Sequence, residues 1–378
     1  MKIKTNWQIK NFEDCLEKIT YTNKIQRKDF LVSGKFPIIS QEAEFINGYW
    51  DDESDLFKVK KPVAIFGDHT QVLKYVDFDF VLGADGVKIL QPNDFLDSKF
   101  FYYFLQSIKL KSLGYARHYR LLKEKEISFP SLSEQHRIVK ILDEVFEGVA
   151  RAKENAEKNL QNSKDLFRSY SQIVFENANG DWVEKKLGEI LYIERGGSPR
   201  PIQKFLTDDP NGINWIKIGD TKNVDKYIIK TRQKIKLEGL KKSRLVNEGD
   251  FILSNSMSFG RPYIMKTTGA IHDGWLVLRE KNSNIIDKDY LYNILGSPYV
   301  FNQFDKLAAG STVRNLNITL VSTVKIPLPS VSEQKSIVAK LDALSAETKK
   351  LEAIYRQKLA DLEELKKSVL KKAFNGEL

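Results

Sequence analysis

The chain has 378 residues, which is enough for two or three domains with cores of their own. A single cysteine excludes a disulfide framework and a multi-cysteine zinc site, and no apolar run approaches the roughly 18 residues that span a bilayer, so we expect a cytoplasmic protein. The formal net charge is +10, and residues 181–329 hold 23 Lys and Arg against 16 Asp and Glu. Such a basic domain is typical of proteins that bind a polyanion such as DNA, although a soluble surface alone would also account for the charge.

Residues 1–130 are predicted to form a first mixed α/β domain. Its first apolar residues have helical spacing, and short runs rich in β-branched and aromatic residues follow, bounded by turn residues. We predict helices at 7–19 and 97–107, and strands at 36–39, 63–66 and 87–90.

Residues 181–329 repeat this plan with different loop sequences. Segment 182–190 corresponds to 7–19, strand 249–254 to 63–66, strand 273–279 to 85–90, and helix 287–295 to the aromatic helix of the first domain. Order and spacing persist while the loops differ. One scaffold therefore carries two different surfaces.

One stretch of sequence occurs twice, and each copy begins a predicted long helix. Pro130-Ser-Leu-Ser-Glu-Gln-His-Arg-Ile-Val-Lys-Ile-Leu-Asp143 matches Pro329-Ser-Val-Ser-Glu-Gln-Lys-Ser-Ile-Val-Ala-Lys-Leu-Asp342 without a gap, at an offset of 199 residues. Such a match indicates a duplicated structural unit. Both copies contain a capping box, in which a hydroxyl accepts from the third helical N–H and a glutamate returns to the N–H of the cap. The boxes are Ser131 with Glu134 and Ser330 with Glu333.

After each cap, an apolar stripe follows a spacing of three and four residues. A narrow stripe between Glu and Lys is typical of a coiled coil, and neither helix can bury its stripe alone. The stripes contain Ile138, Leu142, Val145, Val149, Leu166 and Ile173 in the first helix and Ile337, Leu341, Leu344, Leu351, Leu362 and Leu365 in the second. The predicted fold class is α+β. Two tandem mixed α/β domains, 1–130 and 181–329, are separated by two long helices, 131–180 and 330–378, packed as an antiparallel coiled coil with an internal pseudo-twofold repeat.

The familiar catalytic patterns are absent from the sequence. No Gly-rich loop is followed by Lys-Ser/Thr, the four histidines have no metal-ligand spacing, and no Asn/Asp-Pro-Pro-aromatic motif of an adenine methyltransferase is present. The acidic clusters 51–53 and 208–209 could serve a metal-dependent nuclease, but charge runs of this kind are usually solvated loops.

Loops rich in Arg, Lys, Ser and Asn beside glycines are the candidates for DNA contact. Arginine can bond guanine through two hydrogen bonds, Asn or Gln can do so to adenine, and Lys and Ser suit phosphate. Ordinary turn chemistry would explain the same composition. The candidates are Lys35, His69, Gln71, Lys74, Arg117, His118 and Arg120 in the first domain and Arg195, Ser198, Arg200, Lys204, Lys241, Lys242, Arg244, Asn255, Ser256, Ser258, Arg261 and Arg314 in the second.

Four features together resemble the specificity subunit of a type I restriction–modification system. They are the repeated Pro-Ser-Leu/Val-Ser-Glu-Gln cap, its Ile-Val-x-x-Leu-Asp continuation, the Trp182…Leu187-Gly-Glu-Ile190 domain start and the Ile326-Pro-Leu-Pro329 lead-in. The resemblance covers essentially the whole chain. One departure is that the first domain is shorter and less basic than the second.

The resemblance implies two target recognition domains and two spacer helices in a subunit that is not itself an enzyme. Such a subunit binds double-stranded DNA with a bipartite target, one half-site per domain. It docks two modification subunits, which methylate adenine with S-adenosylmethionine, and restriction subunits that use ATP can join. The chain itself would hold no cofactor and no metal, whereas its partners would use S-adenosylmethionine, ATP and magnesium. No membrane partner is implied.

Two alternatives of other classes remain at this point. One is a free-standing nuclease or methyltransferase with unfamiliar motifs, which incubation of the chain with DNA, magnesium and S-adenosylmethionine would reveal. The other is a coiled-coil adaptor whose globular ends bind proteins. A salt-dependent DNA shift would separate the adaptor from a DNA-binding subunit.

Overall fold

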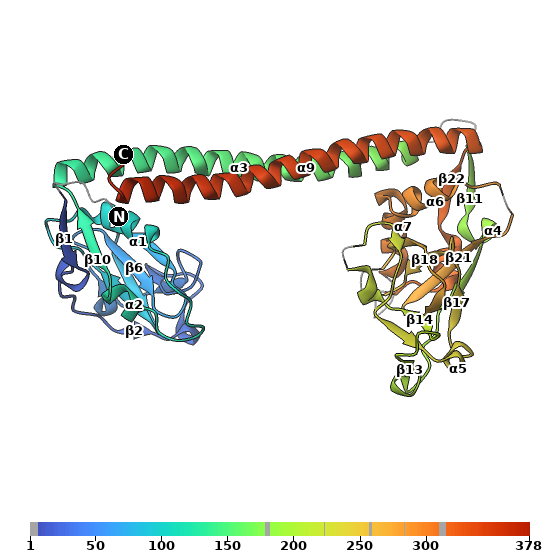
Figure 1. The fold of residues 1–378 in the computed structure, drawn as a ribbon, viewed down its shortest axis with the longest axis horizontal. Coiled ribbons are helices and arrows are strands. Elements are labelled where there is room, and N and C mark those ends of the chain that lie inside the picture. Colours follow the sequence, from blue (N-terminus) through green and yellow to red (C-terminus); the bar gives the residue numbers. More distant parts are fainter. Residues whose placement is uncertain (1–6, 178–181, 223, 257–258, 283, 310–314) are drawn as a thin grey trace. The chain divides into compact units, whose positions relative to one another are not determined.

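The two copies of the repeated stretch begin the two longest helices of the structure. The computed structural model describes residues 7–177, 182–222, 224–256, 259–282, 284–309 and 315–378. Helix α3 spans Leu132–Glu176 and helix α9 spans Val331–Phe374. The chain divides into a first unit, residues 1–157 with 356–378, and a second unit, residues 158–355. Each unit therefore contains a globular region and one segment of each long helix (Figure 1).

The globular region of the first unit lies between β1 and β10, which pair antiparallel with each other. One sheet has the order β2-β8-β3-β4 with β5 also on β8, and a second has the order β7-β6-β9. Helix α1 packs on β6 and β7. The elements are β1 (Gln8–Asn11), β2 (Lys24–Ile25), β3 (Phe36–Ile39), β4 (Gly48–Trp50), β5 (Leu56–Phe57), β6 (Val63–Gly67), β7 (Leu73–Val76), β8 (Phe80–Gly83), β9 (Val87–Leu90), α1 (Ser98–Ser107), α2 (Tyr119–Lys123) and β10 (Glu126–Phe129).

The globular region of the second unit likewise lies between two strands, β11 and β22, which pair antiparallel with each other. Its two sheets have the orders β12-β21-β18-β19-β15 and β13-β16-β14-β20-β17. The strands are β11 (Val183–Lys186), β12 (Leu191–Arg195), β13 (Leu206–Thr207), β14 (Ile213–Ile216), β15 (Tyr227–Ile228), β16 (Gln233–Ile235), β17 (Arg244–Val246), β18 (Phe251–Ser254), β19 (Pro262–Met265), β20 (Gly269–Ile271), β21 (Trp275–Glu280) and β22 (Lys325–Leu328). The helices are α4 (Leu187–Ile190), α5 (Leu237–Leu240), α6 (Lys288–Leu295), α7 (Pro298–Ala308) and α8 (Ile318–Thr323).

Most predicted elements are present, and one is wrong. The strands expected at 36–39, 63–66 and 87–90 and the helix at 97–107 are confirmed as β3, β6, β9 and α1. The helix expected at 7–19 is instead strand β1 followed by a short 3₁₀ turn. Pairing with the distant strand β10 outweighs the local helical spacing, as tertiary contacts often do for short segments.

A buried glutamine joins the start of each long helix to its globular region. Gln135 donates from Nε2 to the carbonyls of Phe95 (3.0 Å) and Pro130 (2.9 Å), and its Oε1 accepts from the N–H of Asp97 at 2.8 Å. Asp97 is the N-cap of α1. The glutamine is fully buried, so each of these polar groups would lack water if the side chain were removed.

The second copy repeats these bonds. Gln334 donates to Ile285 O (3.0 Å) and Pro329 O (2.9 Å), and accepts from the N–H of Asp287 (2.7 Å), which is the N-cap of α6. In both units the glutamine thus fixes a long helix to the helix that covers the sheet.

The helix caps take a form that differs partly from the predicted boxes. Ser330 Oγ accepts from the N–H of Glu333 at 3.3 Å, as expected. The Glu333 carboxylate accepts from the Trp182 indole at 2.9 Å. In the first copy, the N–H of Glu134 donates to the backbone carbonyl of Ser131, and the Glu134 carboxylate accepts two bonds from Arg137.

In the first unit, the early part of α3 packs antiparallel to the late part of α9. Ile138 and Leu142 share a core cluster with Leu370 and Ala373, and Lys153 pairs with Glu363 at 2.8 Å. Val145, Val149 and Leu362 are half-buried, in agreement with the predicted stripe.

Leu365 does not fit the predicted stripe, because it is 46% exposed. Half-buried Lys366 lies in its place, with Nζ 5.1 Å from the centre of the Phe146 ring. The aliphatic stem of a lysine can fill such a position while its charge stays near water.

In the second unit, the late part of α3 and the early part of α9 share another cluster, to which Phe175, Ile337 and Leu341 belong. Leu344 is half-buried. Leu166, Ile173 and Leu351 are 50%, 52% and 37% exposed, so these three predicted stripe positions are wrong.

Two buried polar residues explain why the predicted stripe leaves the buried side of each helix. Ser163 and Thr348 are buried in the stripe, and their hydroxyls donate to carbonyls one turn earlier, those of Asn159 and Leu344. The predicted stripe continued with the next leucine, three residues after each polar position, at Leu166 and Leu351. The buried side of the helix instead continues four residues after each polar position.

Replacement of the buried glutamine tests the joint between helix and globular region. Gln334→Ala leaves two carbonyls and one N–H buried without partners, at about 1–3 kcal/mol for each unpaired group, so we expect the free energy of unfolding to fall by at least about 2 kcal/mol. Urea unfolding measures this loss. Gln357→Ala removes an exposed glutamine from the same helix and should change stability by less than about 0.5 kcal/mol. Equal effects of the two variants would contradict the structural role of Gln334.

Candidate nucleic-acid interface

Three chain segments meet at the end of the same strand in both globular regions. After β6, the N–H of Asp68 donates to Gly86 O (2.7 Å), and Asp68 O accepts from the N–H of His118 (2.8 Å). After β18, Asn255 makes the same two backbone bonds, to Gly274 O (3.0 Å) and from the N–H of Leu316 (2.8 Å). We call these places junction 1, built on Asp68, Gly86 and His118, and junction 2, built on Asn255, Gly274 and Leu316.

An Asp-Gly turn forms part of each junction. Asp85-Gly86 leads into β9 and Asp273-Gly274 leads into β21. Gly86 has a φ of +77°, a conformation that favours glycine. The frame is therefore shared, and the side chains that surround it determine what each junction can bind.

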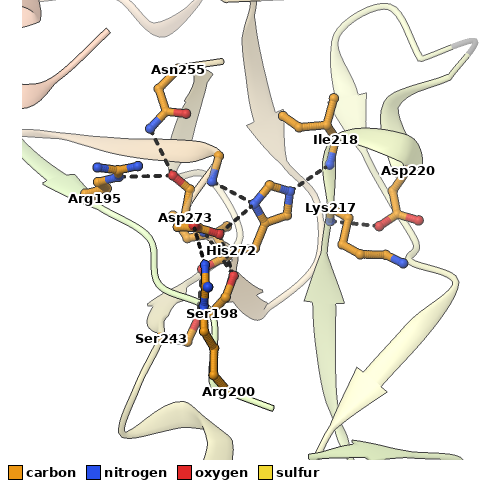
Figure 2. A network of polar contacts seen from close by, with 12 residues as sticks. Arg195, Ser198, Arg200, Lys217, Ile218, Asp220, Ser243, Asn255, His272 and Asp273 are labelled. Carbon is orange, nitrogen blue, oxygen red and sulfur yellow. Dashed lines mark hydrogen bonds and ion pairs between the residues drawn. The ribbon is translucent and has the colours of Figure 1, made fainter. Parts of the chain in front are cut away.

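Asp273 is the centre of a polar network at junction 2 (Figure 2). Its carboxylate accepts from Ser198 Oγ at 2.5 Å and lies 3.8 Å from the Arg200 guanidinium. Its carbonyl accepts from Arg195 Nε (3.1 Å) and Asn255 Nδ2 (3.0 Å). The hydrogen bond from Ser198 is the largest cause that holds the pKa of the Asp273 carboxyl below its usual value. The network positions Arg195 and Arg200 at an exposed edge of the region.

Two glycines let the loop after β12 lie against this network. A Cβ at Gly196 would come within 2.2 Å of His272 O, and one at Gly197 within 2.5 Å of Lys242 O. Their N–H groups donate to Trp275 O and Ile271 O. Only residues without a side chain allow this approach of two backbones.

His272 supports the turn from the inside. Its Nδ1 lies 2.7 Å from the N–H of Gly274, and its Nε2 lies 3.1 Å from the N–H of Ile218. A neutral imidazole has one acceptor nitrogen and an imidazolium has none, so we assign the acceptor to Nδ1, which makes the shorter contact. Burial is the main cause that lowers the pKa of His272, with Lys217 nearby acting in the same direction and Asp273 and Asp220 opposing it. The turn thus requires a neutral ring.

Stacked rings lie beside junction 1. The rings of His69 and Tyr115 are 5.0 Å apart and inclined by 16°, and His69 Nδ1 lies 3.0 Å from Tyr115 O. Gln71 has a φ of +59° in the same loop. Tyr115 is 87% exposed, so this aromatic surface faces solvent.

Most of the predicted contact residues lie on accessible parts of the two regions. The exposed ones are Lys35, Arg117, Arg120, Arg195, Arg200, Lys204, Lys241, Lys242, Arg244 and Arg261, and the half-buried ones are His69, Gln71, Ser198 and Ser256. Arg244 is paired with Glu194 at 3.2 Å. Ser258 and Arg314 lie outside the described residues.

Three predicted contact residues are buried, and we assign them structural roles instead. Lys74 is 3% exposed and donates to Asn47 Oδ1 and to the carbonyls of Glu44 and Phe45, and burial lowers its pKa to about 8. His118 is 1% exposed, with Nδ1 on Asp68 O and Nε2 accepting from the N–H of Leu113. Asn255 is fully buried within junction 2. Composition alone marked these residues, because a loop sequence does not show which of its polar side chains turn inward.

Several residues of the junctions were missed as contact candidates. His272 and Asp273 hold junction 2 together, and Lys24, Lys88 and Tyr115 lie near junction 1. The Asp-Gly pair that occurs in both domains was a signal that could have indicated the turns. Within the described parts of the chain, no group of three His, Cys, Asp or Glu could hold a metal ion, and no helix is long and apolar enough to cross a membrane.

Comparison with known proteins shows the family. The model of the type I restriction modification DNA specificity domain matches residues 4–161 and 179–361. The chain belongs to this family. Its members are DNA specificity subunits without catalytic activity of their own, and the alternatives of a free-standing enzyme and of a protein-binding adaptor are therefore set aside.

Curated specificity subunits and solved structures resemble this specificity subunit over most of its length. The EcoR124I/EcoR124II specificity subunit of Escherichia coli is 26% identical over 341 residues, covering 84% of this chain and 81% of the relative. The MjaVIII specificity subunit of Methanocaldococcus jannaschii is 23% identical and covers 100% and 94%. A chain from a structure of a type I R-M system has a TM-score of 0.78 and 19% sequence identity, with full coverage of both chains. The HsdS subunit of Thermoanaerobacter tengcongensis has a TM-score of 0.59 and 19% sequence identity, and the match covers 100% of this chain and 99% of that subunit. The two structures show the same fold.

The neutral ring of His272 predicts a pH dependence of junction 2. Because the pKa of the folded state lies below the ordinary value of 6.5, protonation favours the unfolded turn, and stability is lost as pH falls below about 6.5. His272→Asn keeps an acceptor for the N–H of Gly274 but does not titrate. We expect the wild-type melting temperature and DNA affinity to fall between about pH 7 and pH 5 and those of the variant to fall less. An unchanged pH profile in the variant would contradict this role.

Proposed function

We propose that this specificity subunit recognises a bipartite DNA target, one half-site with each globular region, and that junctions 1 and 2 are the recognition centres. The observation that carries this proposal is the common backbone frame with different side chains around it. A common frame places both sets of side chains at the same position in their regions. Different side chains allow two different half-sites to be distinguished.

The groups at junction 2 suit a DNA groove. Arg195 and Arg200 are exposed and oriented by Asp273, and arginine is the side chain that most often bonds guanine edges. Lys241 and Lys242 are exposed on the segment that contacts Gly197, where they can bond phosphates. We therefore assign base recognition to the arginines and backbone contacts to the lysines.

The proposed domain boundaries follow from the strand pairs that close each region. Residues 1–130 and 181–329 are proposed as the two recognition domains, because β1–β10 and β11–β22 bring the ends of each region together directly before a long helix. Residues 131–180 and 330–378 are the spacers. A domain whose ends meet in this way can be exchanged without disturbing the helix that follows.

The proposed partners are those of a type I system. The chain docks two modification subunits, which methylate adenine with S-adenosylmethionine, and restriction subunits that use ATP and magnesium can join the complex. The curated relatives carry the name of specificity subunits of type I restriction enzymes, which supports this assembly. The cytoplasm, where bacterial and archaeal DNA lies, is the proposed location.

Genome-wide adenine methylation tests the proposed function. Cells that contain this chain with its neighbouring modification subunit should methylate a split sequence motif that cells without the chain leave unmethylated. A cell with the modification subunit alone is the control. A methylated motif that is the same with and without the chain would contradict the proposal.

A further inference from the structure

A polar cavity of about 490 Å³ opens beside junction 1. Lys24, Lys88, Arg117, His69, Tyr115 and Asp85 line it. Lys24 comes from β2, Lys88 from β9 and Arg117 from the segment before α2, so three separate elements each supply a cation. Asp68 and Gly86 of junction 1 also line the cavity, so it adjoins the proposed recognition centre directly.

The three cations line one cavity together with the carboxylates of Asp68 and Asp85. No ion pair joins Lys24, Lys88 or Arg117 to any residue in the described part of the chain. Burial lowers the pKa of Lys24, and Lys88 and Arg117 lower it further by repulsion, while Asp85 opposes them. Lys88 and Arg117 thus lie near enough to Lys24 to produce a repulsion. A bound anion would remove it.

The same position in the second unit is organised differently. There, Asp273 of the Asp-Gly turn lies 3.8 Å from Arg200 and accepts from Ser198, and Arg244 is paired with Glu194. Asp85 of the first unit forms no such ion pair among the described residues. The less basic region thus contains a cluster of cations that has no ion pair among the described residues.

The walls of the cavity limit what can enter it. The stacked rings of His69 and Tyr115 form one wall. Gly86 keeps the floor open, because a Cβ there would come within 2.7 Å of Gln41 Oε1 and 2.8 Å of His69 Cδ2. Convergent cations with an exposed aromatic ring beside them suit a phosphate with a sugar or base next to it.

We propose that Lys24, Lys88 and Arg117 form a binding site for a phosphate of the DNA backbone. This site rests on the proposed function and extends it. It holds the duplex against the first globular region independently of sequence, and the neighbouring loop then contacts the bases. None of the candidates drawn from the sequence placed Lys24 or Lys88 in the interface.

The salt dependence of DNA binding tests this site. The double variant Lys24→Gln/Lys88→Gln, in the full chain assembled with its modification subunit, is titrated with a duplex that carries the methylated motif and with a scrambled duplex of equal length. The salt range is about 50 to 200 mM. Each lost phosphate contact should make the plot of log K, the DNA association constant, against log salt concentration less steep by about 1. Over this salt range, the affinity of the wild-type chain should therefore fall by about 3-fold more than that of the variant for each lost contact. Both duplexes should lose affinity equally.

A matched control removes one exposed charge elsewhere on the same region. Lys18 is exposed and lies shortly after the 3₁₀ turn at 13–15. The adjacent Glu17 donates its N–H to Gln91 O, and Gln91 lies at the opposite end of β9 from Gly86. Lys18→Gln should leave the salt slope unchanged, and thermal unfolding should show all variants folded to the same temperature.

Three outcomes would overturn the site, and one would overturn more. A wild-type slope in the double variant would exclude a phosphate contact. A loss of affinity only for the duplex that carries the motif would indicate base recognition instead. An equal loss of slope in Lys18→Gln would indicate a general charge effect. Failure of the wild-type complex to bind either duplex would overturn the proposed function itself, on which the site depends.

Discussion

The structure depends on one buried side chain that occurs in both copies of the repeat. Gln135 and Gln334 each bond two carbonyls and one N–H, and in each unit they connect a long helix, the preceding Pro and the N-cap of the helix that covers the sheet. A glutamine can make these three bonds at once because its amide both donates and accepts. The loops on the far side of each globular region can then vary without moving the helix, because none of these bonds involves them.

The shared frame continues to the two junctions, where the chemistry diverges. The backbone bonds of Asp68 and Asn255 are the same, yet junction 2 orients its arginines through Asp273 and junction 1 gathers cations that have no ion pair among the described residues. If junction 1 binds a DNA phosphate as proposed, the net charge of a region does not by itself rank it as a DNA-binding surface. What matters is whether a cation is already neutralised within the protein, since a paired arginine or lysine must give up that interaction to bind a phosphate.

The sequence was sufficient wherever a local pattern determines the structure. The duplicated Pro-Ser-x-Ser-Glu-Gln stretch predicted both long helices, and the aromatic helix and three strands followed from spacing and turn residues. It failed where distant contacts decide: β1 is a strand because β10 pairs with it, and Leu166 is exposed because Ser163 takes the stripe position. In the site, loop composition predicted Arg200 and Arg117, which are exposed, but could not separate them from Lys74, whose ammonium turns inward to the carbonyl of Glu44. Direction of a loop side chain depends on tertiary packing, which composition does not contain.

The most direct test of the account is a chain with two copies of the first recognition region. Residues 8–129 replace residues 183–328, so that the new ends meet at the strand pair that precedes each long helix. If each region recognises its own half-site, adenine methylation in cells will occur at a motif whose two halves are both the half-site of the first region. Retention of the original second half in the methylated motif would contradict the claim that each globular region recognises one half of the target.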